Sequence, residues 1–468
     1  MTTDSWIKKY YGSLLLGILF FSFVTRIYNL HIPERYIFDE VYHAVTAKLI
    51  AQNDPRAFEW WNPPPEKDTA VDWLHPPLAK YTQALAMNFF GENSFGWRIS
   101  SAFFGVLVIF LIAKLSLSLT KDYTISILAT LFAALEGLLL VMSRIAMNDI
   151  HVTFAILLTL LLYLKTKPFS VKKDLSHPIG WYVLTGLSAG VAIASKWSGI
   201  FVLGIIFFYE LLQIAEQLYH TIETKKRKIQ KKYFVEALAQ LGLVMVALIV
   251  VPSIVYIASY TQMFLQGKDF THFIELHKQI WWYQSGLTAT HTYQSTPLEW
   301  VINKRPVWMH VTYTETGERG DIYAHGNSIV LLAGLLAVLF YSFSLLKKLL
   351  NSPDSKQPFA AVLATFRTPI AFTVLSYFTM WIIWIRSPRI MFFYHYTPAI
   401  PFLVIILSIF LKKVFDLPEK YQPLAQATVI TTIILSLIYF IVFLPHWLGI
   451  PLPIKFVDSV FFFFESWK

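Results

Sequence analysis

The chain carries a series of apolar runs, most of them close to the roughly 20 residues that a helix needs to cross the hydrocarbon core of a membrane. They lie at about residues 11–30, 98–119, 124–142, 149–165, 180–195, 198–218, 235–259, 326–346, 369–386, 391–411 and 425–445. Only 15% of the residues are charged, whereas soluble domains are about one quarter charged. A transmembrane β-barrel would instead show alternating segments of about ten residues. The sequence therefore predicts an all-α integral membrane protein, a single domain over residues 1–468 with about eleven transmembrane helices.

Composition excludes several other classes of protein. The chain has no cysteine, so disulfides, thiolate catalysis and cysteine-based metal sites are excluded. A net charge of +10 could suggest nucleic acid as a partner, but the basic runs lie between apolar runs, where they act as topology signals beside an anionic membrane. We therefore expect the lipid bilayer, and not nucleic acid, as a partner. The first residues lead into a full-length span without a small-residue cleavage site, so no cleavable signal peptide is expected.

The basic residues between the spans predict the orientation of the chain in the membrane. If the N-terminus is cytoplasmic, the following basic residues all face the cytoplasm: Lys8, Lys9, Lys121, Lys165, Lys167, Lys172, Lys173, residues 225–232, Lys347, Lys348, Lys412 and Lys413. This agrees with the positive-inside rule. Two long segments, residues 31–97 and 260–325, are then extracytoplasmic. Residues 78–90 of the first follow two prolines and are expected to form an amphipathic surface helix.

The first outer segment opens with Phe38-Asp39-Glu40-Val41-Tyr42-His43, which places two adjacent carboxylates at a membrane surface. Charge is costly there and usually has a function. Cations also occur at short outer turns, where the positive-inside rule does not expect them: Arg144, Lys196, Arg386 and Arg389. Carboxylates and cations beside lipid are the groups needed to transfer a sugar from a lipid phosphate, because fixed cations stabilise the departing phosphate and a carboxylate can accept the proton of the attacking hydroxyl. Asp39 is the candidate base, while Glu40 could position the acceptor or hold a cation such as Arg98.

Each of these groups also has a purely structural interpretation. Asp39 and Glu40 could belong to a solvated loop or help to cap a helix. His43 could complete a divalent-metal site with the two carboxylates, although no third clear ligand is evident. Arg386 and Arg389 could clamp one phosphate or simply anchor the end of a span.

Three further outer residues have similar alternatives. Arg144 and Asp149 could form an ion pair across a turn. Lys196 could extend to the membrane interface, as single lysines commonly do. His75, which precedes two prolines, could be a turn residue. The many aromatic rings of residues 260–325 suit a membrane–water belt and also sugar contacts.

Taken in order, these motifs resemble those of the protein O-mannosyltransferases. The similar stretches are residues 38–43 (FDEVYH), 75–80 (HPPLAK), 95–99 (FGWRI), 143–149 (SRIAMND), 195–199 (SKWSG), 291–295 (HTYQS), 305–308 (RPVW) and 394–399 (YHYTPA). The Asp-Glu pair by itself recurs across glycosyltransferases of the C fold. The ordered set covers nearly the whole chain and is far more specific.

The resemblance implies a glycosyltransferase C fold, a polyprenyl- or dolichyl-phosphate-mannose donor and a Ser/Thr hydroxyl of an exported protein as acceptor, with inversion at the anomeric carbon. By position, Asp39 would be the catalytic aspartate, supported by Glu40 and Arg98. The residues expected in or near the donor site are His75, Arg144, Asp149, Lys196, Arg386, Arg389 and His395. No cofactor is implied, and a divalent metal is left open. The expected location is the plasma membrane, with an extracytoplasmic active site.

A departure from the eukaryotic members of the family and three rival functions remain. Eukaryotic members carry a β-trefoil domain between spans seven and eight, and residues 260–325 are too few to hold one, so the chain resembles the shorter prokaryotic form. The nearest rival is an enzyme of the same fold that moves another lipid-linked sugar to a lipid or glycan. A transporter would place its site near the bilayer midplane and often shows internal repeats, and neither feature is evident. A non-catalytic partner subunit is the third rival.

Overall fold

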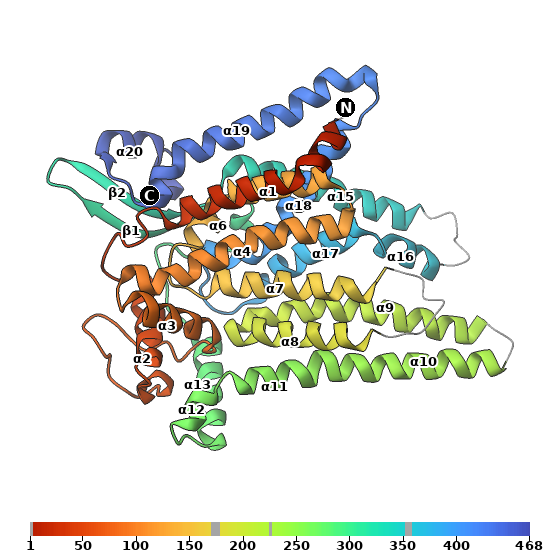
Figure 1. Cartoon of the computed structure of the whole chain (residues 1–468), viewed down its shortest axis with the longest axis horizontal. Coiled ribbons are helices and arrows are strands. Elements are labelled where there is room, and N and C mark those ends of the chain that lie inside the picture. Colours follow the sequence, from red (N-terminus) through yellow and green to blue (C-terminus); the bar gives the residue numbers. More distant parts are fainter. Residues whose placement is uncertain (1–2, 170–177, 224–226, 352–357) are drawn as a thin grey trace.

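A computed structural model describes residues 3–169, 178–223, 227–351 and 358–468, and they are mostly helical (Figure 1). Within these ranges, nine helical segments are long and apolar enough to cross a membrane. They are Asp4–Ile27, Ser94–Thr120, Asp149–Thr166, Trp197–Tyr219, Arg227–Ala258, Ser328–Leu350, Pro369–Arg386, Phe393–Phe415 and Glu419–Leu448. Two shorter apolar helices, Tyr123–Ala134 and Ile179–Ser195, occupy the other two predicted spans. Each predicted span therefore corresponds to an apolar helical segment, in the predicted order.

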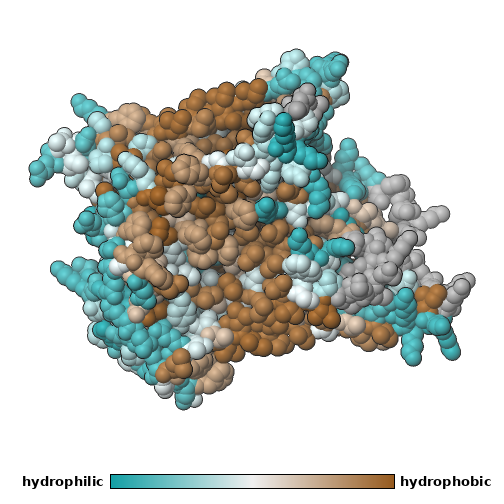
Figure 2. Space-filling view, in the orientation of Figure 1, coloured by the Kyte–Doolittle hydropathy of each residue, from teal (hydrophilic) through white to brown (hydrophobic). Residues whose placement is uncertain are grey.

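The spans are built from the following elements: α1 (Thr3–Ile27), α4 (Ser94–Thr120), α5 (Tyr123–Ala134), α6 (Gly137–Met142), α7 (Asp149–Tyr163), α8 (Ile179–Ser195), α9 (Phe201–Glu223), α10 (Arg227–Met245), α11 (Val251–Ala258), α15 (Ser328–Leu350), α17 (Pro369–Ile382), α18 (Ile400–Phe415) and α19 (Gln422–Leu448). A short helix, α16 (Pro358–Phe366), precedes α17. Figure 2 shows an apolar band across the middle of the visible face with hydrophilic residues at both ends, as expected for a multi-pass membrane protein. Of the basic residues used to predict orientation, Lys172, Lys173, Lys225 and Lys226 lie outside the described residues.

Both long connecting segments gather at one end of the molecule, here called the loop end, on the left in Figure 1. The first contributes α2 (Glu40–Ala51), a short 3-10 turn at Pro55–Phe58 and α3 (Leu78–Phe90). The helix predicted at residues 78–90 is thus present. It buries Ala84 and Met87 and exposes Leu85, Phe89 and Phe90.

The second segment contains α12 (Thr261–Leu265), α13 (Phe270–Gly286), α14 (Pro297–Trp300) and a hairpin of β1 (Val307–Tyr313) and β2 (Glu318–Ala324). The short strand β3 (Leu452–Pro453), followed by α20 (Ile454–Val460), pairs with β2 and gives the sheet order β1-β2-β3. This sheet is the departure from the predicted all-α fold. Strand β1 reads Val-Trp-Met-His-Val-Thr-Tyr, and such β-branched and aromatic residues favour strands. The same aromatic residues had suggested only a membrane belt or sugar contacts.

Local sequence explains where several spans begin. The Asn93 side chain accepts a hydrogen bond from the backbone N–H of Gly96 at the start of α4. The Asp122 carboxylate accepts bonds from the N–H groups of Thr124 and Ile125 at the start of α5. These are N-cap contacts, which satisfy backbone donors that a helix leaves free at its first turn. They let α4 and α5 follow each other across a turn that contains only Lys121 and Asp122.

Candidate active site

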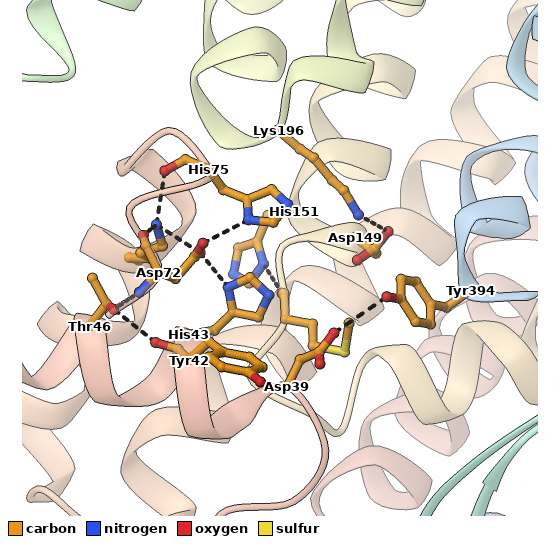
Figure 3. Close-up of polar contacts among 12 residues, drawn as sticks. Asp39, Tyr42, His43, Thr46, Asp72, His75, Asp149, His151, Lys196 and Tyr394 are labelled. Carbon is orange, nitrogen blue, oxygen red and sulfur yellow. Dashed lines mark hydrogen bonds and ion pairs between the residues drawn. The ribbon is translucent and has the colours of Figure 1, made fainter. Parts of the chain in front are cut away.

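Asp39 lies at the N-cap position of α2, but its side chain makes no capping hydrogen bond. The carboxylate instead accepts a bond from the Tyr394 hydroxyl, with 3.3 Å between Tyr394 Oη and Asp39 Oδ2 (Figure 3). The preceding residue, Phe38, has a φ of 47°, in the left-handed region that a residue with a side chain rarely adopts. Its ring packs edge-on against Tyr394 and Phe392. The chain is therefore held in an unfavourable backbone conformation that directs Asp39 away from its own helix.

Glu40 holds Arg98, as one of the two sequence interpretations predicted. Arg98 Nε and Nη2 each donate to a Glu40 carboxylate oxygen at 2.8 Å, and both side chains are buried. The same carboxylate accepts the N–H groups of Ile37 and Ala146, and the guanidinium also donates to carbonyls of Leu30, Pro33 and Arg35. This ion pair therefore ties the loop before Asp39 to α4 and to the turn that precedes α7. Glu40 is fully buried and does not position an acceptor.

Lys196 forms a buried ion pair with Asp149, with 2.7 Å between Lys196 Nζ and Asp149 Oδ1. Asp149 is the first residue of α7 and Lys196 follows the last residue of α8. Lys196 Nζ also lies 5.6 Å from the centre of the Tyr394 ring. Two structural interpretations are thus wrong: Lys196 does not extend to the interface, and Asp149 does not pair with Arg144. Arg144 donates instead to the carbonyl oxygens of Thr25 and Arg26.

Asp72 is the centre of a second cluster beside Asp39 (Figure 3). Its carboxylate oxygens lie 2.7 Å from His43 Nδ1, 2.8 Å from His75 Nδ1 and 2.9 Å from Lys80 Nζ. Burial by itself would raise the pKa of the Asp72 carboxyl, but the close contacts with His75, Lys80 and His43 outweigh it and hold that pKa well below its usual value. Asp72 is therefore ionised and paired.

This cluster overturns the idea that His43 completes a metal site with Asp39 and Glu40, because Glu40 is committed to Arg98 and His43 faces Asp72. The residues His43, Asp72 and His75 bring ligand atoms within 4.8 Å of one another. Lys80, however, is buried and also donates to the carbonyl oxygens of Asp72 and His75. A divalent ion on the same carboxylate would face this ammonium at close range and be repelled. The cluster as it stands does not fit a metal ion.

A cavity of about 330 Å³ opens next to Lys196. Its polar wall contains Lys196, His75, Arg389 and His395, and its apolar wall contains Ile200, Phe201, Trp281 and Trp384. His395 is buried and stacks parallel to the Trp300 ring. Arg389 contacts the Gln284 side chain of α13. The cavity thus combines cations with aromatic and aliphatic surface.

Asp39 differs from the other carboxylates of this region. Glu40, Asp72 and Asp149 each contact a cation, whereas Asp39 has no ion-pair partner among the described residues. Burial raises the pKa of Asp39 above the ordinary aspartate value, and the charges of His43 and Lys196 offset only part of that shift. A carboxylate with a raised pKa and no cation partner is suited to accept a proton.

The structure brings most of the predicted site residues together. Glu40, next to Asp39 in the chain, pairs with Arg98, and Lys196, which pairs with Asp149, shares Tyr394 as a neighbour with Asp39. His75, Arg389 and His395 line the cavity. Arg386 is exposed and is not part of the cavity wall, so the two arginines do not form a clamp there. Arg144 supports the carbonyl end of α1.

Sequence analysis missed Asp72, Lys80 and the Tyr394 hydroxyl as neighbours of Asp39. Asp72 and Lys80 flank His75 at three and five residues' distance, and that local grouping was the available signal. Tyr394 stands 355 residues after Asp39, and only the fold brings it there.

Replacing Arg98 with methionine should strongly destabilise the protein. It leaves the Glu40 carboxylate buried without its cation, and breaking a buried pair in this way costs about 3–5 kcal/mol. The measurement is the unfolding free energy in detergent. Lys48→Met is the matched control, because the Lys48–Glu66 pair is only half-buried and solvent-accessible pairs contribute less than about 1 kcal/mol. Equal losses in the two variants would contradict a central role for the Glu40–Arg98 pair.

Comparison with known proteins identifies the family of the chain. Residues 17–266 match the family model described as dolichyl-phosphate-mannose-protein mannosyltransferase. Residues 269–467 match the C-terminal four-transmembrane region of protein O-mannosyltransferase. The chain is 24% identical to a polyprenol-phosphate-mannose–protein mannosyltransferase of Corynebacterium glutamicum, over 84% of this chain and 81% of that protein. It is also 24% identical to the enzyme of that name from Mycolicibacterium smegmatis, over 85% and 81%.

Solved structures show the same fold. The protein O-mannosyltransferase Pmt1–Pmt2 complex of S. cerevisiae, bound to its sugar donor, aligns with a TM-score of 0.77 at 14% identity, over 98% of this chain and 92% of that one. ArnT of Cupriavidus metallidurans, bound to undecaprenyl phosphate, aligns with a TM-score of 0.52 at 13% identity, over 96% and 77%. These are membrane glycosyltransferases of the C fold. With family models matching both halves of the sequence, the chain belongs to the protein O-mannosyltransferase family.

Proposed function

We propose that this mannosyltransferase moves mannose from a polyprenyl-phosphate-mannose donor to Ser/Thr hydroxyls of exported proteins, with inversion at the anomeric carbon. The relatives named above are polyprenol-phosphate-mannose–protein mannosyltransferases. The observation that carries the mechanism is the position of Asp39. Unlike Glu40, Asp72 and Asp149, it has no cation partner among the described residues, and the Tyr394 hydroxyl joins it to the segment that contributes His395 to the cavity.

The cavity suits the lipid-phosphate part of such a donor. A phosphate placed near Lys196 and Arg389 would meet two cations, and a polyprenyl chain would meet the surface of Ile200, Phe201 and Trp384. When the sugar leaves, negative charge builds on the phosphate, and fixed cations stabilise that charge in the transition state. Asp149 keeps Lys196 in position through their ion pair.

Transfer then needs one bond to form and one to break. The acceptor hydroxyl oxygen attacks the anomeric carbon from the face opposite the phosphate. The bond from that carbon to the phosphate oxygen breaks, and its electron pair leaves with the phosphate. The hydroxyl proton passes to the Asp39 carboxylate, which acts as general base. Attack opposite the leaving group inverts the anomeric centre.

The asymmetry of the molecule supports the proposed orientation. Asp39 immediately precedes α2, which lies at the loop end (Figure 1), opposite the basic connections expected in the cytoplasm. We therefore place the active site on the extracytoplasmic side of the plasma membrane, in one membrane domain.

Asp39→Asn should lower the rate of mannose transfer at least a hundredfold, as expected for loss of a general base, while donor binding persists. The assay combines purified protein, radiolabelled polyprenyl-phosphate-mannose and a Ser/Thr-rich peptide. Asp68→Asn, an exposed change in the same loop, is the control and should retain activity. Near-normal turnover in Asp39→Asn would exclude Asp39 as the base.

The pH dependence of the wild-type rate gives a second test. The base acts when it is ionised, and its pKa is raised. The rate should therefore fall as the pH decreases, with a midpoint above the ordinary aspartate pKa of about 4.

The same assay separates the rival functions. Peptide labelling by the wild type but not by Asp39→Asn supports the enzyme, its donor and its base together. A folded protein that transfers nothing from this donor, but does transfer another lipid-linked sugar to a lipid or glycan, would be the enzyme of the same fold. Inactivity with every donor and acceptor would favour a partner subunit or a transporter.

Arg389→Gln should raise the KM for the lipid donor about tenfold, because it removes a charged donor from the cavity wall. Arg386→Gln is the matched control, since Arg386 is exposed three residues earlier and does not line the cavity. The measurement is initial rate against donor concentration at saturating peptide. An equal increase in both variants would indicate a general effect of surface charge and not a phosphate contact.

Cysteine labelling tests the orientation, because the chain has no cysteine of its own. A cysteine introduced by Lys67→Cys, at an exposed position of the loop end, should react in whole cells with a reagent that cannot cross the membrane. Lys228→Cys, exposed at the opposite end, should react only after the cells are opened. The reverse pattern would place Asp39 on the cytoplasmic side.

A further inference from the structure

Strand β1 is an edge strand whose outer side is open. It pairs with β2 on one side only, in the order β1-β2-β3. Among the described residues, no other backbone group bonds to it. The strand becomes increasingly exposed toward its end, with Val311 partly exposed and Thr312 and Tyr313 exposed. The hairpin extends from the loop end beside the segment that leads to Asp39 (Figure 1).

The register shows which groups face outward. The N–H of Thr314 donates to the carbonyl of Glu318, and Thr312 lies opposite Gly320. In an antiparallel pair, bonded and non-bonded positions alternate, so Thr312 and Thr314 bond to β2 while Val311 and Tyr313 turn their N–H and C=O groups outward. A second contact agrees: the exposed Arg35 guanidinium lies 3.5 Å from the Val311 carbonyl oxygen.

This edge lacks the features that usually keep a strand from pairing with another chain. Exposed edge strands are commonly protected by charged residues, prolines or bulges that point outward. The sequence Val-Trp-Met-His-Val-Thr-Tyr of β1 has no Lys, Arg, Asp, Glu or Pro, and its bulge lies between Trp308 and His310, before the exposed part. The outer half of β1 can therefore form backbone hydrogen bonds with an added strand.

Side-chain contacts connect this edge to the segment that leads to Asp39. Arg35, which reaches Val311, is four residues before Asp39, and its carbonyl is held by Arg98. At the other end of the strand, Trp308 contacts Tyr293, and Tyr293 contacts His291. The His291 ring in turn lies 6.4 Å from that of Phe38, the residue before Asp39.

We propose that the free edge of β1 binds the acceptor polypeptide as an extended strand and thereby presents its hydroxyl to Asp39. This inference rests on the proposed function, in which the acceptor is a protein. Strand addition uses main-chain hydrogen bonds, with side chains contributing specificity at alternate positions. An acceptor N–H takes the place beside the Val311 carbonyl that the exposed Arg35 side chain fills in the free protein. Main-chain pairing explains how one site accepts Ser or Thr within different sequences, provided that the segment is extended.

The test compares a long and a short acceptor in the transferase assay. The long acceptor is a peptide of about 15 residues with one threonine, and the short one is N-acetylthreonine amide, which has too little chain to pair with β1. Val311→Pro removes the outward N–H without removing a bond to β2. It should raise the KM for the long peptide about tenfold, with kcat and transfer to the short acceptor unchanged. Val311→Thr keeps the N–H and is the control. An unchanged KM for the long peptide would overturn the inference.

A second measurement leaves the protein unaltered, in case Val311→Pro does not fold. Wild-type protein is assayed with two sets of long peptides, N-methylated at even or at odd amides around the threonine. Strand pairing predicts a raised KM for one set only, because alternate amides face β1. Equal effects of both sets would overturn the inference. Failure of the proposed function would give a different result, because neither the long nor the short acceptor would then be labelled. That result would also overturn the inference.

Discussion

The buried ion pair between Glu40 and Arg98 is the interaction on which the rest of this site depends. It joins the loop after α1 to the first turns of α4 and, through the Ala146 N–H, to the turn before α7. A buried carboxylate and guanidinium are costly to desolvate, and they are tolerable here because the remaining donors and acceptors reach backbone groups. With these segments fixed, the residue before Asp39 is held in its left-handed conformation. The pair therefore determines where the candidate base lies without touching a substrate itself.

The carboxylates around Asp39 have ion-pair partners, whereas Asp39 itself has none among the described residues. Lys196 balances Asp149, and Lys80 with two histidines balances Asp72. Each pair satisfies a charge that would otherwise be expensive beside lipid. Asp39 is left with a neutral neighbour, the Tyr394 hydroxyl. A carboxylate kept among paired charges but without a cation of its own can exchange a proton at little cost to the surrounding structure.

The helical part of the fold could be predicted because apolar length is a local property of the sequence. Each predicted span corresponds to an apolar segment of the structure, even where the helix is short, as in α5 and α8. The Glu40–Arg98 contact was also within reach, since Glu40 stood in the predicted outer segment 31–97 and Arg98 at the start of the span that follows it. The partners of Asp149 and Asp72 were not, because they depend on how distant segments pack, and nearby residues of opposite charge, such as Arg144, offered a plausible but incorrect alternative. The β1–β2 hairpin was missed because rings that favour a strand also favour a membrane interface.

The burial of these ion pairs has a consequence for the media in which such a site can work. Dissolved ions weaken attraction between exposed charges over about 10 Å at 0.1 M ionic strength, but they screen buried pairs much less. Lys196–Asp149, Lys80–Asp72 and Arg98–Glu40 are all shielded by protein. Their geometry is therefore set by packing and not by the surrounding electrolyte. The ion pairs beside Asp39 should therefore respond much less to ionic strength than exposed pairs would.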